Sequence, residues 1–235
     1  MRLEARVAEK SFRTAAGQSV PVIANLSFTL EEGETGALIG PSGCGKSTLM
    51  RILAGLDRNF DGSVHIPAYG KVGMVFQEPR LLPWRSVEDN VRLAAPQATE
   101  AEVAALFAAL GLSEHRAHFP GELSTGLARR AALARAFAVR PTLLLLDEPF
   151  VSLDAPLARQ LQRDLARLVE SRRMITLLVT HDVDEAIALA DRIFVLSPPP
   201  ARVVGEIKIK TPRATMSDEE RKAVRARIEA LRDGG

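Results

Sequence analysis

The sequence predicts an α/β fold with a mainly parallel β-sheet, and two observations support this prediction. Strand-like and helix-like segments alternate along the chain, as they do in proteins whose parallel strands are joined by helices. Residues 143–146 form a continuous apolar run, which is typical of a central strand covered on both faces, and residues 174–180 are predicted to form another buried strand. Because the sequence contains neither an internal repeat nor a linker, we expect a single domain over residues 1–235.

The first predicted elements surround a glycine-rich loop. Alternating apolar residues predict a strand over 22–30, and turn residues then lead into a second, short strand over 35–39. The segment 47–55 places its leucine and isoleucine side chains at helical spacing and ends at Gly55, which predicts a helix with a glycine at its C-terminal end. The order strand, loop, helix is therefore expected at this point of the chain.

The later helices are predicted from residues that start or end a helix. Short β-like segments at 63–66 and 71–76 come first. Helices are then expected to begin at residues whose side chains can accept a hydrogen bond from a backbone N–H: Ser86, Thr99, Ser124 and Ser217. Gly111 and Pro141 are expected to end two of them, and a further helix is expected over 183–190.

Composition and charge exclude several classes of protein. The 235 residues are 46% hydrophobic and 26% charged, close to the average for soluble globular proteins. The 31 basic and 29 acidic residues leave a formal charge of +2, which is too small to indicate a surface that coats nucleic acid. No apolar run is long enough to cross a bilayer, the first residues do not form a secretory signal, and the single cysteine, Cys44, allows no internal disulfide. We therefore expect a cytoplasmic chain.

The loop GPSGCGKS, which occupies 40–47, fits the pattern of a phosphate-binding loop between a strand and a helix. Glycines let successive backbone N–H groups point at phosphate oxygens, and the start of the helix adds positive potential. Lys46 would reach the β and γ phosphates, and Ser47 would supply a hydroxyl to Mg²⁺. The alternative, a glycine-rich turn without a ligand, is disfavoured by the strand-to-helix context.

Polar residues follow the apolar runs at points where an open α/β sheet binds its ligand. Asp147 is in position to hold the magnesium shell, and Glu148 to accept a hydrogen bond from the water that attacks the γ-phosphate. Solvated acids at a strand end are the alternative. Gln77 and His181 also end apolar segments, but spacing alone does not distinguish a functional role from an ordinary structural one.

The order of six motifs resembles that of the nucleotide-binding subunit of an ATP-binding-cassette (ABC) transporter, and the resemblance covers nearly the whole chain. The segments correspond, in order, to the Walker A, Q-loop, signature, Walker B, D-loop and H-loop motifs: GPSGCGKST, VFQEP, LSTGL, LLLLDEP, SLD and THD. Six motifs in one order are far more specific than any single motif. The resemblance implies a P-loop NTPase (RecA-like) core, an N-terminal antiparallel β subdomain and an inserted helical subdomain at about 80–140.

The resemblance also implies cofactors, ATP and Mg²⁺, and roles for individual residues. Gln77 would link the metal and the attacking water to the partner surface, His181 would contact the γ-phosphate, and Phe12 would stack on adenine unless it is a core residue. The implied catalytic residues are Lys46, Gln77, Glu148 and His181, and the implied magnesium ligands are Ser47, Gln77 and Asp147. The implied ATP-binding residues are Phe12, Gly40, Pro41, Ser42, Gly43, Cys44, Gly45, Lys46, Ser47, Thr48, Ser124 and Gly126.

In this family two cassettes dimerise head to tail, so that the signature motif of one closes over ATP bound to the other. Ser124 and Gly126 match the signature residues, and Asp154 would lie at the dimer seam. The implied partners are a second cassette, as a homodimer, integral membrane permease subunits and a separate solute-binding protein, with no nucleic acid. The chain would then lie at the inner face of the cell membrane.

The signature motif departs from the usual Leu-Ser-Gly-Gly-Gln. Thr125 replaces a glycine with a β-branched residue that resists positive φ, and Leu127 replaces a glutamine. Because the other catalytic residues are present, we expect ATP hydrolysis to survive. Arg129, Arg130 and Arg135 follow the motif without interleaved aromatic residues, so a solvated or dimer-facing surface is expected rather than a nucleic-acid patch.

The segment 78–91, EPRLLPWRSVEDNV, resembles cassettes of importers for nitrate, sulfonates, taurine and related small compounds. Leu81, Leu82 and Trp84 would form a groove that receives a short coupling helix of the membrane subunit; core packing is the alternative. Two other functions stay open. One is a soluble ABC protein of DNA repair or translation, although the sequence shows none of the usual coiled-coil insertions or zinc motifs. The other is a regulatory cassette that hardly hydrolyses ATP.

Overall fold

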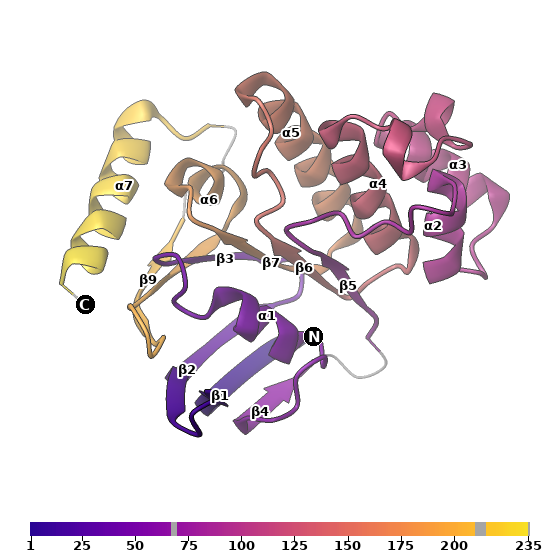
Figure 1. The fold of residues 1–235 in the computed structure, drawn as a ribbon. Helices are drawn as coiled ribbons and strands as arrows, with labels where there is room; N and C mark the ends of the chain where they lie inside the picture. The colour runs from indigo at the N-terminus through magenta and orange to yellow at the C-terminus, as the bar shows by residue number, and fades with distance from the viewer. Residues whose placement is uncertain (67–69, 210–214, 235) are drawn as a thin grey trace. The chain divides into compact units, whose positions relative to one another are not determined.

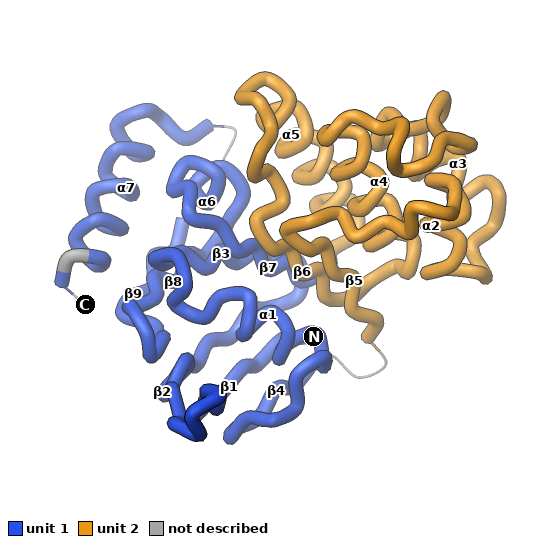
Figure 2. The backbone as a smooth tube through the Cα atoms, in the orientation of Figure 1, with its two compact units in different colours: residues 1–68, 175–235 blue, residues 69–174 orange. Residues whose placement is uncertain are grey.

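The computed structural model describes residues 1–66, 70–209 and 215–234 (Figure 1). The chain folds into two units, which Figure 2 colours separately. Unit 1 comprises residues 1–68 and 175–235, and unit 2 comprises residues 69–174. Unit 1 is therefore built from the two ends of the sequence, and unit 2 from the middle.

An antiparallel sheet in unit 1 contains β1 (Arg2–Arg13), β2 (Ser19–Glu31) and β4 (Asp61–His65), in the order β2-β1-β4. The predicted strand over 22–30 is confirmed as part of β2, but the sequence analysis missed β1. This strand alternates in the way that a half-buried strand must, because Leu3, Ala5 and Val7 are buried while the residues between them are charged.

The second sheet of unit 1 carries the strand that precedes the glycine-rich loop. In it, β3 (Thr35–Ile39) lies between β7 (Ile175–Thr180) and β8 (Arg192–Leu196) and is parallel to both. At the edge, β9 (Val203–Lys208) pairs with β8 in the antiparallel direction. All residues of β3 and β7 are buried, as is typical of strands covered on both faces; burial was predicted for β7, whereas β3 was predicted only as a short strand. The sequence analysis had no strand at β8.

Three helices belong to unit 1: α1 (Lys46–Leu53), α6 (Val183–Leu189) and α7 (Asp218–Asp233). The predicted end of α1 is confirmed, because the residue after its C-cap, Gly55, has φ +71°. Helix α7 starts with the predicted capping box between Ser217 and Glu220 and buries Ile228 completely. Helices α6 and α7 contact each other (Figure 1).

Unit 2 combines a pair of parallel strands with most of the helices (Figure 1). Strand β5 (Val72–Val75) pairs with β6 (Leu143–Asp147), whose residues are all buried. The helices are α2 (Val87–Ala94), α3 (Glu100–Ala109), α4 (Thr125–Ala138) and α5 (Ala155–Arg172), with short 3₁₀ turns at Ser113–His115 and Pro120–Glu122. Helix α4 packs against α2 and α3.

The predicted N-terminal caps of the unit 2 helices are confirmed. The Ser86, Thr99 and Ser124 side chains each accept a hydrogen bond from a backbone N–H of the following turn, and Thr99 forms the expected capping box with Glu102. Among the residues that the structure describes, no helix is long and apolar enough to cross a membrane.

Candidate nucleotide-binding site

The glycine-rich loop in unit 1 links β3 to α1 through two left-handed glycines. Gly43 has φ +75° and Gly45 has φ +111°, conformations that side chains disfavour. A Cβ on Gly45 would also lie 2.9 Å from Val22 Cγ1 and 3.2 Å from the Val22 carbonyl oxygen. Gly45 is the N-cap of α1 and offers no side-chain cap, so the first N–H groups of α1 are not occupied by a capping side chain. Such a helix start is suited to an anion such as phosphate.

Lys46 holds the loop in its curved form. Its side chain is buried, and Nζ donates hydrogen bonds to the carbonyl oxygens of Gly40 (2.8 Å) and Pro41 (2.9 Å). The Cys44 thiol lies beside it, and burial raises the pKa of Cys44 more than the Lys46 charge lowers it. The thiol therefore stays protonated at neutral pH and packs as an apolar group, while the Ser47 side chain is exposed.

Phe12 lies near the end of β1 opposite Val20, and its side chain is 48% exposed. It is therefore not a core phenylalanine. Lys10 Nζ lies 4.7 Å from the ring centroid and is itself held by Asp57 at 2.9 Å and by the carbonyl oxygen of Asn59 at 2.6 Å. The ring thus has an ordered, exposed place on the antiparallel sheet, as a stacking platform for a flat ligand requires.

His181 directly follows β7, and its side chain is exposed. The backbone around it is fixed on both sides. Thr180 Oγ1 donates a hydrogen bond to Glu185 at 2.5 Å and accepts one from the backbone N–H of Asp182 at 3.0 Å. The Asp182 carboxylate in turn caps α6.

In unit 2 the structure brings Gln77, Asp147 and Glu148 to the same end of two neighbouring strands. Strands β5 and β6 are parallel, with Val75 opposite Leu146, so Gln77 and Glu148 each stand two residues beyond this last pair. Asp147 is buried, whereas Gln77 is exposed and Glu148 is half-buried. Spacing had predicted a common edge for such residues but not this register.

Glu148 has a left-handed backbone, with φ +45°. For a residue with a side chain, such a conformation costs about 1–3 kcal/mol, and strained residues of this kind cluster at functional sites. The backbone N–H of Val151 donates a hydrogen bond of 3.3 Å to the Glu148 carbonyl oxygen, which closes a turn directly after β6. The carboxylate is thereby directed by a strained turn rather than by a continuing strand.

The signature segment forms the first turn of α4. Ser124 is the N-cap, its side chain is exposed, and Oγ accepts a hydrogen bond from Leu127 N at 3.3 Å. Thr125 is the first residue of the helix and does not have a positive φ. The expectation that its β-branched side chain would oppose a positive φ at this position is therefore wrong. Gly126 is buried against Leu157, and a Cβ there would lie 2.4 Å from Leu157 Cδ2, so a larger residue would require the Leu157 side chain to move. Asp154 is the N-cap of α5, and its Oδ1 accepts a hydrogen bond of 2.9 Å from the backbone N–H of Leu157.

Trp84 is 69% exposed, so the alternative of core packing is wrong for this residue. The loop that contains Trp84 is held by hydrogen bonds to the buried side chain of Asn90. This role of Asn90 was not predicted from the sequence. Asn90 accepts a hydrogen bond from Leu82 N at 2.8 Å and donates to the carbonyl oxygens of Leu82, Arg85 and Ser86 at 2.9–3.2 Å. An asparagine that serves four backbone groups keeps this loop in one shape.

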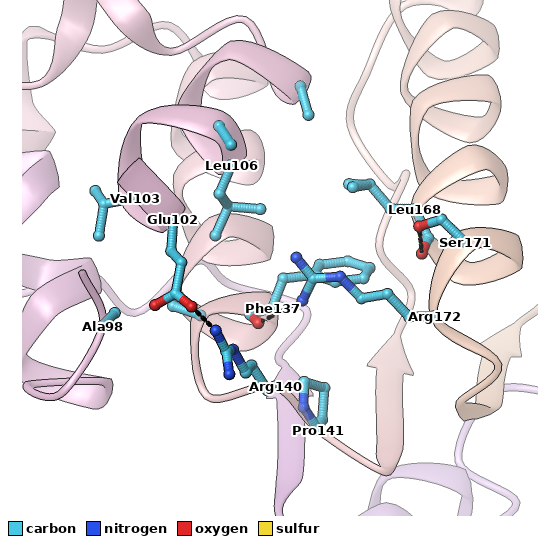
Figure 3. Close-up of a pocket in the computed structure, with 13 residues that line it drawn as sticks. Ala98, Glu102, Val103, Leu106, Phe137, Arg140, Pro141, Leu168, Ser171 and Arg172 are labelled. Carbon is cyan, nitrogen blue, oxygen red and sulfur yellow. Dashed lines mark hydrogen bonds and ion pairs between the residues drawn. The ribbon is translucent and has the colours of Figure 1, made fainter. Parts of the chain in front are cut away.

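A cavity of about 600 Å³ opens in unit 2 between α3 and the C-terminal ends of α4 and α5 (Figure 3). Its walls are mainly alanine, valine and leucine side chains. Arg140 pairs with Glu102, and Arg172 donates a hydrogen bond of 2.9 Å to the Phe137 carbonyl oxygen. None of the sequence-predicted site residues lines this cavity. The two arginines therefore connect the C-terminal end of α4 to α3 and to α5.

The oxygen donors among the predicted residues suit magnesium. Ser47 offers a hydroxyl, Gln77 an amide oxygen and Asp147 a carboxylate, all hard ligands. Within the described part of the chain, no group of three or more His, Cys, Asp or Glu residues could hold a metal ion. Each of these donors is of the kind found around Mg²⁺, which usually takes one or two carboxylates and completes its shell with phosphate oxygens and water.

Comparisons with known proteins agree with the motif order. Residues 23–151 match the family model described as "ABC transporter". A Burkholderia cenocepacia protein named as an aliphatic sulfonates import ATP-binding protein is 41% identical over 235 residues, covering 96% of this chain and 85% of its own. A protein of the same name from Pseudomonas syringae pv. tomato is 44% identical over 214 residues, covering 90% of each chain.

A solved structure extends the similarity to the fold. It is a dimeric, post-hydrolysis ATP-binding cassette bound to ADP and Pi, with a TM-score of 0.78 and 27% identity. The match covers 90% of this chain and 100% of that one. The predicted fold class, a P-loop NTPase core with an antiparallel β-sheet near the N-terminus and inserted helices, is confirmed.

Proposed function

Because the chain belongs to the ABC transporter family, we propose that it is the ATP-hydrolysing subunit of an importer. It couples Mg-ATP binding and hydrolysis in a dimer of cassettes to the uptake of a small solute. The observation that carries this proposal is the loop between β3 and α1. Its left-handed glycines, uncapped helix start and buried Lys46 form a cradle for phosphate oxygens.

The chemistry is an in-line attack of water on the γ-phosphate, for which the protein supplies positioning and charge. Lys46 and the loop N–H groups hold the phosphates, and Glu148 accepts a hydrogen bond from the attacking water. His181 contacts the γ-phosphate, and Phe12 stacks on adenine. Ser47, Gln77 and Asp147 would hold Mg²⁺, which neutralises phosphate charge when it is bound.

We further propose that two copies of this chain assemble head to tail, each a single ABC domain over residues 1–235 with its helical subdomain at about 80–140. Ser124 and Gly126 would then act on the nucleotide of the other copy, and Asp154 would lie at the seam. The exposed Ser124 at the start of α4 supports this role, because it presents the positive end of a helix.

The solute proposed is an aliphatic sulfonate, since the curated relatives described above are named for sulfonate import. The other partners proposed are permease subunits and a separate solute-binding protein. The chain would work as a peripheral subunit at the inner face of the cell membrane, without nucleic acid. Specificity for the solute would reside in those partners.

Uptake by a reconstituted transporter tests this function. Vesicles that contain the permease, this chain and ATP inside, with the binding protein outside, are expected to accumulate a labelled alkanesulfonate. Vesicles loaded with the Glu148→Gln variant serve as the control. ATP-dependent uptake that is absent for sulfonates, or equal in the control, would contradict the proposal.

The segment around Trp84 is proposed to receive a short helix of the membrane subunit. Because Trp84 is the only tryptophan of this chain and is largely exposed, its emission should shift when permease subunits free of tryptophan are added. Nucleotide alone should change it less. The measurement is the emission maximum in detergent, and an unchanged maximum with the permease bound would rule out this docking surface.

A further inference from the structure

Arg129 occupies an unexpected place in α4. The expectation of a solvated or dimer-facing surface for the arginines after the signature motif is wrong for Arg129 and Arg130, which are 4% and 7% exposed. Arg129 donates two hydrogen bonds of 3.3 Å, from Nη1 to the Phe76 carbonyl oxygen and from Nη2 to that of Val151. The guanidinium therefore bridges two segments that are far apart in sequence.

Both acceptors adjoin residues with proposed roles in hydrolysis. Phe76 directly precedes Gln77, and Val151 closes the turn that begins at Glu148. These segments lie beyond the last paired residues of β5 and β6, so the strand ladder no longer fixes their separation. The hydrogen bonds of Arg129 connect the two segments just beyond the point where backbone pairing between β5 and β6 ends.

Burial of the charged Arg129 side chain is energetically unfavourable. Burial lowers the pKa of Arg129, and the negative charges of Glu148 and Glu78 oppose that effect. Its Nε is buried and has no hydrogen-bond partner among the residues that the structure describes. An incompletely bonded, buried guanidinium is a poor means of stabilising a fold, because an apolar side chain of similar volume is often as good or better.

Arg130, its neighbour, shows the structural alternative. Its Nη1 donates to Asp164 at 2.9 Å and to the Leu110 carbonyl oxygen at 3.0 Å. It is thus a buried arginine with an ion-pair partner, and these hydrogen bonds go to neither the Gln77 segment nor the Glu148 turn. The two arginines differ in partners while sharing helix, burial and residue type.

We propose that Arg129 is a positioning residue for ATP hydrolysis, which ties the Gln77 segment to the Glu148 turn and holds the Glu148 carboxylate by its charge. This inference rests on the proposed function. Arg129 contacts no nucleotide in this role; it acts through the backbone of the two segments and through the field at Glu148. It should therefore affect the chemical step more than ATP binding.

The test compares Arg129→Met, Arg129→Lys and Arg130→Met in the complete transporter. Arg129→Met, which keeps volume but removes the bonds and the charge, should lower kcat by about tenfold or more and change the Kd for ATP by less than about threefold. Arg129→Lys should recover part of kcat, because it keeps the charge. Hydrogen exchange should accelerate in Arg129→Met within peptides that cover 76–79 and 148–152.

Arg130→Met is the matched control and should show the opposite pattern. It should lower Tm more than Arg129→Met does, because the half-buried Asp164 then keeps, among the described residues, only the 4.0 Å ion pair with Arg167, yet keep kcat within about twofold below its Tm. Equal kcat in Arg129→Met and wild type, or equal losses in both methionine variants, overturns the inference. Wild type without ATPase activity above Glu148→Gln would instead refute the proposed function itself.

Discussion

Replacing Glu148 with glutamine is expected to lower kcat for ATP hydrolysis by at least about 100-fold, the scale of a lost general base. Glutamine is the same size as glutamate and would adopt the same left-handed backbone conformation, with φ +45°, at a similar energetic cost. The fold should therefore be little changed. The amide cannot accept a proton from water as a carboxylate does. ATP binding should persist, because the phosphate loop is unaltered.

Phosphate release and nucleotide-dependent dimerisation together check this prediction. The variant should form dimers in ATP that are longer lived than those of wild type, as measured by light scattering. Glu114→Gln removes an exposed carboxylate from the turn Ser113–His115 and serves as the control, with wild-type turnover expected. A Glu148→Gln protein that keeps more than about a tenth of wild-type kcat would remove Glu148 from the role of base.

Replacing Lys46 with methionine is expected to raise the Kd for ATP by about 100-fold and to abolish turnover. The substitution removes the positive charge that we propose contacts the phosphates, where charge-assisted hydrogen bonds are the stronger ones. It also leaves the buried Gly40 carbonyl oxygen without its hydrogen-bond donor, at a cost of about 1–3 kcal/mol, and removes the partly exposed hydrogen bond to the Pro41 carbonyl oxygen.

The rise in Tm on adding ATP measures the effect of Lys46→Met, because a ligand stabilises only the protein that binds it. Wild type should show a clear rise and the variant none at the same concentration. Lys208→Met removes an equal charge from an exposed position at the end of β9 and should behave as wild type. An undiminished ATP-induced rise in the Lys46 variant would contradict the phosphate-cradle geometry.

Local features of this fold could be predicted from the sequence because their causes are local. The caps at Ser86, Thr99 and Ser217 follow from the hydrogen bond that a hydroxyl makes to a nearby N–H. The phosphate loop follows from glycines placed between a strand and a helix. The apolar run 143–146 of β6 follows from burial on both faces.

Features that depend on distant partners escaped prediction. Strand β1 is rich in charge, and only its alternation with Leu3, Ala5 and Val7 reveals a buried face. The burial of Arg129 depends on carbonyl groups at Phe76 and Val151, which no local pattern brings to it. The difficulty expected at Thr125 came from assuming a loop conformation where the structure has a helix start.

The pairing of β3 has a consequence for synthesis of the chain. Thr35 pairs with Thr176 and Gly36 with Arg192, so β3 finds its neighbours only after most of the protein has left the ribosome. Contacts between residues so far apart form late, because a long loop must be closed first. A nascent chain that ends before β7 thus carries the whole GPSGCGKS loop without either strand that pairs with β3.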